Sequence, residues 1–298
     1  MSTFIHYSNC PICQSERIAP FLQAKDHTVS GEVFAVWKCE ACLGAFTQDI
    51  PGQEQIGAYY KADSYVSHTD TQTGLVNQLY HRVRKITLNS KKDLVASTCG
   101  IKQGSLLDIG AGTGAFAGFM KSAGWSVTGL EPDPEARNLA KERNNIDLLS
   151  PDQLYSLPEK SFDAITLWHV LEHVHDLHGY MDRIRQLLKP GGKAFIAVPN
   201  HTSHDALKYQ QYWAAWDVPR HLYHFSPAAM KQLFSQHGLS LYKMKPMWFD
   251  SFYVSMLSVQ HRSGGSGFIP GMLMGAVSNL YALGNVAKCS SVIYIASC

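Results

Sequence analysis

Residues 106–114 decide the fold, because Leu106-Leu-Asp-Ile-Gly-Ala-Gly-Thr-Gly114 passes directly from an apolar run into a glycine-rich loop. The apolar run is typical of a short buried strand over 105–109, and residues 115–123 after the loop are predicted to form a helix. Glycine tolerates left-handed backbone conformations and lets a ligand approach the chain closely. The stretch therefore predicts a strand–loop–helix unit that binds a ligand.

The same alternation continues on the carboxy-terminal side. Further strands are predicted over 125–130, 162–168 and 193–198, with helices over 135–144 and 177–188 between them. A helix over 227–237, capped by Ser226, and two edge strands over 239–244 and 291–296 complete the pattern. Strands that alternate with helices imply an α/β, Rossmann-like parallel sheet that binds its ligand at the carboxyl ends of the strands.

Two acidic residues beside the loop discriminate between cofactors. The loop also satisfies the loose dinucleotide pattern, with Glu131 about twenty residues further on. However, Asp108 stands two residues before the first glycine, where its charge would repel a pyrophosphate. S-adenosylmethionine carries an ammonium and a sulfonium and no phosphate, so Asp108 favours it, and Glu131 can accept hydrogen bonds from ribose hydroxyls.

Four of the seven cysteines form two C-x-x-C pairs near the amino terminus, namely Cys10, Cys13, Cys39 and Cys42. Two such pairs complete a tetrahedral four-sulfur zinc site, whereas a redox motif needs only one pair. A site closed by four protein ligands leaves no position for water. The pairs therefore predict a structural zinc ion in a small zinc-ribbon-like module.

Composition restricts location and partners. Charged residues make up 17% of the 298, and 26 Lys and Arg against 24 Asp and Glu give a net charge of +2, so DNA is not expected as a partner. No signal peptide or transmembrane run is apparent, which favours a cytoplasmic protein. The expected domains are a zinc module over 1–50, a helical connector over 51–100 and a main domain over 101–298. Acceptor-side insertions are expected at about 200–226 and 250–288, the second as a lid or a homodimer contact.

The motif order resembles that of class I S-adenosylmethionine-dependent methyltransferases. Its components are 106–114, Leu130-Glu-Pro-Asp133, Ser161-Phe-Asp-Ala-Ile165, His169-Val-Leu-Glu-His173 and Leu188-Lys-Pro-Gly-Gly192. The resemblance implies a seven-stranded sheet and an enzyme that uses this cofactor. It also implies that the cofactor contacts Asp108, Gly110, Ala111, Gly112, Gly114, Glu131 and Pro132, with adenine near Asp152, Gln153 and Leu154 and with His169 bordering the reaction centre.

The acceptor is less defined. A four-cysteine module before such a core is similar to the arrangement in some bacterial sugar methyltransferases, which implies a small acceptor such as a nucleotide-linked sugar or another cell-envelope glycan or lipid precursor. The stretch from Trp213 to Ser226 resembles the Methyltransf_23 type, whose acceptors are uncharacterised. The candidate catalytic groups are His169, His173 and His221. Candidate acceptor-binding residues are Trp213, Trp216, Arg220, His221 and His224, and a packed loop explains the same residues equally well.

Several alternatives stay open. The stretch His169-Val-Leu-Glu-His173 satisfies an inverted zinc-peptidase pattern, which its position after a parallel strand disfavours, although Glu172 or His173 could hold a divalent cation. A nicotinamide-dependent sugar enzyme is disfavoured by Asp108. An RNA or protein methyltransferase and a non-catalytic cofactor-binding zinc-ribbon protein are the remaining alternatives.

Overall fold

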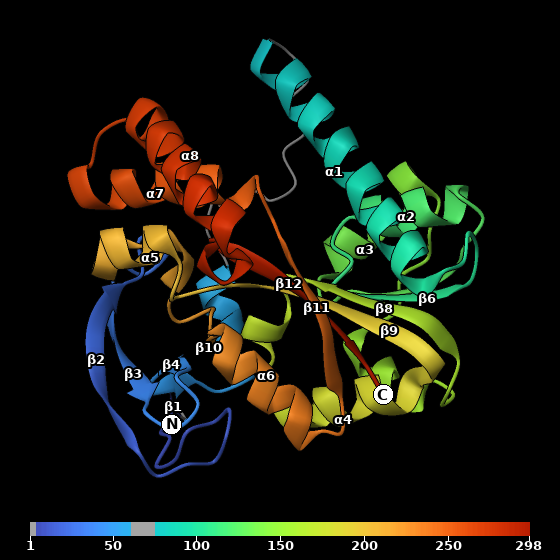
Figure 1. Ribbon diagram of the computed structural model, residues 1–298, viewed down its shortest axis with the longest axis horizontal. Helices are drawn as coiled ribbons and strands as arrows, with labels where there is room; N and C mark the ends of the chain where they lie inside the picture. Colours follow the sequence, from blue (N-terminus) through green and yellow to red (C-terminus); the bar gives the residue numbers. More distant parts are fainter. Residues whose placement is uncertain (1–3, 61–74) are drawn as a thin grey trace. The chain divides into compact units, whose positions relative to one another are not determined.

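The computed structural model describes residues 4–60 and 75–298 (Figure 1). Contacts divide the chain into two compact units, each built from separate stretches of sequence. The first unit contains the described residues up to Tyr60, His169–Tyr180 and Ile196–Ile295. The second contains helix α1 (Leu75–Cys99) onward to Trp168, with Met181–Phe195 and Ala296–Cys298. Residues 61–74 of the expected connector lie outside the described residues, and the expected domain boundaries stay a prediction.

The main sheet confirms the α/β, Rossmann-like class. Among the described residues it has six strands in the order β11-β12-β9-β8-β6-β7. Strand β6 pairs in parallel with both β7 and β8, so that Asp108 stands opposite Gly129 on one side and Thr166 on the other. The strands are β6 (Ser105–Ile109), β7 (Ser126–Leu130), β8 (Phe162–Trp168), β9 (Leu188–Pro199), β11 (Ser240–Pro246) and β12 (Ser291–Ser297).

The seventh strand expected from the resemblance is reduced to a single bridge. Leu149 pairs in parallel with Leu130, and its N–H donates to the Gly129 carbonyl at 2.9 Å. Asn145 has a left-handed backbone (φ 48), so an extended segment that leads to Leu149 can begin only after Asn145. Pro151, which has no N–H to donate to a ladder, opens the short helix η2 (Pro151–Ser156) just after the bridge. The strand is therefore cut short at both ends.

Helices complete the second unit, and α2, α3 and α4 agree with their predicted ranges to within a residue or two. Asp133 caps α3 by accepting a hydrogen bond from the Glu135 N–H at 2.9 Å, and Pro134 occupies the first turn. Strand β9 begins at Leu188, earlier than the predicted 193, directly after α4. The helices with residues in this unit are α1, α2 (Ala115–Ser122), α3 (Pro134–Asn144), η2 and α4 (Leu177–Leu187).

The first unit contains a small antiparallel sheet built on the cysteine segment. Its order is β10-β4-β3-β2, and β10 pairs with β4 through Tyr223 opposite Phe46. Thr47 Oγ1 also donates to the His221 carbonyl at 2.7 Å, so distant parts of the sequence complete one sheet. The strands are β2 (Ile18–Lys25), β3 (Val33–Cys39), β4 (Ala45–Thr47) and β10 (Tyr223–His224), with a separate pair β1 (Phe4–Ile5) and β5 (Ile50–Pro51).

The insertion at 250–288 forms two helices that lie side by side, α7 (Asp250–Ser263) and α8 (Phe268–Gly284), both drawn in red and orange in Figure 1. A Cβ at Gly271 would lie 2.4 Å from Met256 Cα, so glycine permits this close packing. The outer face of α8 exposes large apolar side chains, among them Ile269, Leu273 and Leu283. Its predicted role as a lid or dimer contact stays a prediction.

The first unit also contains several helices, most of them short. Helix α6 begins at the predicted cap, where Ser226 Oγ accepts a hydrogen bond from the Ala229 N–H. These elements are η1 (Ile56–Tyr60), η3 (Leu171–His173), α5 (His204–Tyr209), η4 (Gln210–Tyr212), η5 (Ala214–Trp216), α6 (Pro227–Gln236) and η6 (Val286–Lys288). Across residues 4–60 and 75–298, no helix is both long and apolar enough to cross a membrane.

Candidate functional site

The glycine loop of the second unit is fixed to strand β7 and to Glu131. The N–H groups of Gly110 and Ala111 donate to the Leu130 carbonyl at 2.8 and 2.9 Å, and the Gly112 N–H donates to Glu131 Oε2 at 2.7 Å. Gly110, Gly112 and Gly114 all have positive φ. The loop conformation therefore depends on glycine at these positions.

Two of the glycines differ in what surrounds them. A Cβ on Gly114 would lie 2.7 Å from Ile146 Cγ2 and 2.8 Å from Ala140 Cβ, so this glycine lets α2 begin close to α3. A Cβ on Gly112 would have no atom within 4 Å. Gly112 therefore borders open space, where a ligand can approach the backbone.

Glu131 presents a buried carboxylate next to that space. Its second oxygen, Oε1, accepts from the Asp133 N–H at 3.0 Å, and only 8% of the residue is exposed. Arg137 donates to the carbonyls of Glu131 and Pro132 at 2.7 and 2.9 Å, which holds the turn after β7. A carboxylate can accept about four hydrogen bonds, so this geometry suits a ligand with neighbouring hydroxyl groups.

Asp108 is a second buried carboxyl at the end of β6. Thr166 Oγ1 donates to Asp108 Oδ1 at 2.6 Å. Burial raises the pKa of Asp108 to about 6, against the opposing effects of this hydrogen bond and of the charge of Lys91. Lys91 Nζ also lies 4.2 Å from the centre of the Trp168 ring. Once ionised, such a carboxylate attracts a cationic ligand group strongly, because little water screens it.

The expected adenine contacts lie in η2. Leu154 is fully buried, and its carbonyl accepts from Arg183 Nε at 3.0 Å. Asp152 and Gln153 are exposed, and Gln153 Nε2 donates to Asp152 Oδ2 at 3.2 Å. Their role in binding adenine stays a prediction.

The four amino-terminal cysteines converge in the first unit. Cys10 Sγ lies 3.7 Å from Cys42 Sγ, and Cys13 Sγ lies 3.5 Å from Cys39 Sγ. Backbone N–H groups of Ala41 and Gly44 point at the Cys39 and Cys42 sulfurs, both at 3.4 Å. A hydrogen bond from Cys10 lowers the pKa of Cys42 to about 6. Tetrahedral zinc with bonds of about 2.3 Å requires sulfurs about 3.8 Å apart, so these positions fit zinc.

Histidines from two stretches of the first unit surround Glu172. His169 Nδ1 lies 3.2 Å from Glu172 Oε1, and His169 Nε2 lies 2.8 Å from Asp250 Oδ2. Burial alone would lower the pKa of His169, but the charges of Asp250 and Glu172 outweigh it and raise this pKa to about 10. His169 also has a left-handed backbone (φ 58), a strained conformation that is found at functional sites.

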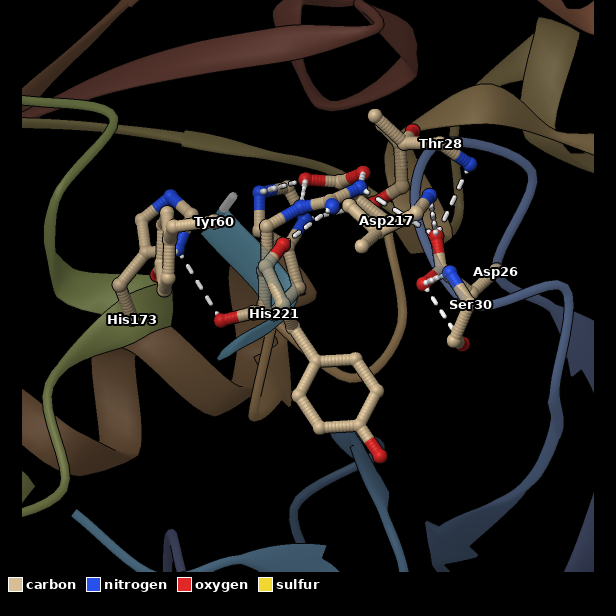
Figure 2. Close-up of polar contacts among 11 residues, drawn as sticks. Asp26, Thr28, Ser30, Tyr60, His173, Asp217 and His221 are labelled. Atoms are coloured by element: carbon tan, nitrogen blue, oxygen red, sulfur yellow. Dashed lines mark hydrogen bonds and ion pairs between the residues drawn. The ribbon is translucent and has the colours of Figure 1, made fainter. Parts of the chain in front are cut away.

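His173 and His221 form the other side of this cluster (Figure 2). Their rings are 4.6 Å apart and nearly perpendicular. His173 Nδ1 lies 3.0 Å from both the Arg220 carbonyl and Tyr60 Oη. Burial, with the charge of His221, lowers the pKa of His173 to about 4. The three candidate catalytic histidines are thus brought together around one carboxylate.

The candidate acceptor-binding residues are largely engaged within the fold. Trp213 Nε1 donates to Asp205 Oδ2 at 2.8 Å, and Trp216 Nε1 donates to the Gln210 carbonyl at 2.7 Å. His224 Nε2 lies 3.1 Å from Thr47 Oγ1. All three side chains are buried. This packing matches the packed-loop alternative, while an acceptor-binding role stays a prediction.

Arg220 is the centre of a buried charge network. Its guanidinium pairs with Asp217 and lies 3.7 Å from Asp26 Oδ1, while Nη1 donates to the Tyr59 carbonyl at 2.8 Å. Asp26 also accepts three backbone N–H bonds, including those from Thr28 and Ser30 shown in Figure 2. The network holds the loop that carries His221.

Some residues of these clusters could not be found from sequence. Thr166 and Lys91 reach Asp108 through strand register and through packing of α1, neither of which the sequence reveals. Asp250 is distant in sequence from its partner His169. Glu172 had a signal, since it stands between the histidines of the 169–173 motif.

Relatives by sequence carry methyltransferase names. A demethylmenaquinone methyltransferase of Tropheryma whipplei is 31% identical over 134 residues, which are 43% of this chain and 56% of the relative. A ubiquinone biosynthesis O-methyltransferase of Pelagibacter ubique is 30% identical over 182 residues, 57% of this chain and 76% of the relative. The chain thus spans little more than half the length of the first of these relatives.

A likeness in fold and a family model agree with these relatives. The solved geranyl diphosphate C-methyltransferase of Streptomyces coelicolor A3(2) has a similar fold, with a TM-score of 0.52, 12% identity, and 79% of this chain and 89% of that one covered. A family model described as "Methyltransferase domain" matches residues 79–243. Because this match covers more than half of the 298 residues, the chain belongs to the methyltransferase-domain family.

Proposed function

We propose that this protein is a methyltransferase that transfers the methyl group of S-adenosylmethionine to a small-molecule acceptor. The observation that carries the proposal is the glycine loop of the second unit, which has open space at Gly112 and buried carboxyls at Asp108 and Glu131. Family membership and the names of the relatives support the same activity.

Each group at the loop has a role that follows from its chemistry. When bound, S-adenosylmethionine supplies an activated methyl group on sulfur. Ionised Asp108 attracts the ammonium of its methionine part, and Glu131 accepts hydrogen bonds from the ribose hydroxyls. Gly112 permits close contact with the backbone. Asp152, Gln153 and Leu154 in η2 would border the adenine.

The acceptor side involves the first unit. His169, His173 and His221 are the candidate groups for acceptor activation, because their ring nitrogens surround the buried Glu172. A base must be neutral, so the raised pKa of His169 suits a charged hydrogen-bond donor better than a base. We propose a nucleotide-linked sugar or another cell-envelope glycan or lipid precursor as the acceptor class. The names of the relatives add demethylmenaquinone and precursors of ubiquinone to the candidates.

We further propose a structural zinc ion at Cys10, Cys13, Cys39 and Cys42. The sulfur separations of 3.5 and 3.7 Å and the backbone N–H groups directed at two of the sulfurs support this proposal. Such N–H groups stabilise thiolate charge, as other outer contacts do at metal sites.

Calorimetric titration with S-adenosylmethionine, S-adenosylhomocysteine and NAD tests the proposal. We expect the first two to bind, and binding to weaken by about tenfold to a hundredfold in Asp108→Asn and Glu131→Gln, since each variant loses a charge-assisted contact. Asp147→Asn is the matched control, because the Asp147 carboxylate is exposed and pairs with Lys141.

The outcomes separate the alternatives. Binding of NAD in place of the other two ligands would refute the methyltransferase proposal. Cofactor binding without methylation of any small-molecule extract, with methylation of RNA or protein instead, would change the acceptor class. Binding without any turnover would favour the non-catalytic alternative.

A further inference from the structure

We infer that Glu172, His173 and His221 form a binding site for one divalent transition-metal cation, separate from the four-cysteine site. One ligand atom from each residue lies within 4.8 Å of the others, and all three belong to the first unit. A carboxylate and two imidazoles are a common ligand set for such cations, and they leave coordination positions open.

The hydrogen bonds of the two imidazoles leave a metal-binding nitrogen on each ring. His173 Nδ1 faces the Arg220 carbonyl at 3.0 Å, and His221 Nδ1 faces the Ala215 carbonyl at 2.8 Å. A carbonyl only accepts hydrogen bonds, so each Nδ1 carries the proton and each Nε2 keeps a lone pair. Metal-binding histidines are typically oriented in this way, by donating the other N–H to a carbonyl or carboxylate.

Glu172 has a buried carboxylate oxygen without a hydrogen-bond partner among the described residues, which packing of a core does not explain. That oxygen is Oε2, and the side chain is fully buried. His169 satisfies only the other oxygen, Oε1. An unsatisfied buried charged oxygen is costly, and it calls for an ion or another positive group that completes the site.

A second carboxylate, that of Asp217, lies next to His221. Asp217 Oδ2 lies 3.9 Å from His221 Nε2, but Asp217 also pairs with Arg220. Asp217 is thus partnered by a guanidinium, whereas Glu172 Oε2 has no hydrogen-bond partner among the described residues and can accept an external cation.

The ligand types favour particular cations. Imidazole suits Zn²⁺, Cu²⁺, Fe²⁺ and Ni²⁺, whereas carboxylate suits Mn²⁺, and a site with both ligand types can bind either group. Mg²⁺ and Ca²⁺ prefer oxygen ligands throughout. A cation held by three protein ligands could also bind an acceptor oxygen and lower its pKa, so that its proton leaves more easily before the methyl group arrives. That role in catalysis rests on the proposed function, whereas metal binding does not.

Mn²⁺ binding, measured by electron paramagnetic resonance without any cofactor, is the test. The full chain is first given one equivalent of zinc, which fills the thiolate site, because thiolates select zinc over Mn²⁺. We expect one Mn²⁺ to bind per chain, with spin-echo modulation from two imidazole nitrogens. Affinity should fall at least about tenfold in Glu172→Gln and in His221→Asn, where the amide can still donate to the Ala215 carbonyl.

His201→Gln is the matched control, because His201 is also a buried histidine with a carbonyl contact, 3.1 Å from Leu43 O, outside the cluster. Its Mn²⁺ affinity should stay within about twofold of wild type. Thermal unfolding and zinc content show that each variant is folded. No uptake of Mn²⁺ by wild type, equal uptake by Glu172→Gln, or a bound ion without imidazole nitrogens would overturn the inference. None of these results would affect cofactor binding at Asp108 and Glu131.

Discussion

Asp108 combines burial with a titratable carboxyl at the end of β6, and under the proposed function this combination should make cofactor binding depend on pH. Only the carboxylate attracts an ammonium group, and burial raises the pKa of Asp108 to about 6. Affinity for S-adenosylmethionine should therefore be constant above about pH 7 and fall about tenfold by pH 5. Calorimetry between pH 5 and 8 measures this. Asp108→Asn should bind weakly with no such dependence, and an equal pH slope in that variant would contradict the assignment.

The free energy of unfolding should also depend on the pKa of Asp108, but in the opposite direction from cofactor affinity: it should be higher at low pH. A carboxyl whose pKa rises from 3.8 to about 6 on folding contributes most to stability below pH 3.8, and this contribution is lost as pH rises through 6. Asp108→Asn does not titrate, so it should gain stability over wild type between pH 4 and 7, by roughly 1–3 kcal/mol. Urea unfolding at both pH values tests this, and an unchanged difference would argue against a raised pKa.

Helices α7 and α8 provide a prediction at the scale of the element. A Cβ on Gly275 would lie 2.7 Å from Phe252 Cα, so a larger side chain must push the helices apart. Gly275→Leu should destabilise the protein by about 1–3 kcal/mol. Ala276→Leu is the control, because Ala276 is exposed on the same helix, and it should change stability by less than about 0.5 kcal/mol. Equal effects in urea unfolding would show that the close packing contributes little.

How far the sequence predicts an element depends on whether local or distant residues form it. The strand–loop–helix unit around Gly110 could be predicted, because periodicity and glycine spacing are local signals. The seventh strand is limited to one bridge at Leu149, between Asn145 and Pro151, and composition does not reveal the left-handed backbone of Asn145. Strand β10 is two residues long and exists only through pairing with β4, so no periodicity could indicate it. The partner of His169, Asp250, was hidden for the same reason.

At the scale of the whole molecule, zinc at the four cysteines should contribute to folding free energy. Cys39 ends β3, and β4 begins at Ala45, so loss of the proposed metal should loosen the connection between these two paired strands. Cys39→Ser should lose zinc and several kcal/mol of stability, because binding to a structural site is coupled to folding. Cys298→Ser is the control, since Cys298 is exposed and outside the cluster. Zinc content with thermal unfolding provides the measurement, and a zinc-free variant of unchanged stability would contradict a structural role.

The pairing of β10 with β4 limits how recombination could separate the segments of this gene. Strand β4 of the cysteine segment pairs with β10 (Tyr223–His224), and Thr47 Oγ1 donates a hydrogen bond to the carbonyl of His221. A gene fragment that encoded only the first 60 residues would specify a sheet with an uncovered edge, and exposed edges promote aggregation. Recombination could therefore transfer the cysteine segment to another protein only together with a substitute for β10. The two stretches of sequence are expected to have diverged as one unit of descent.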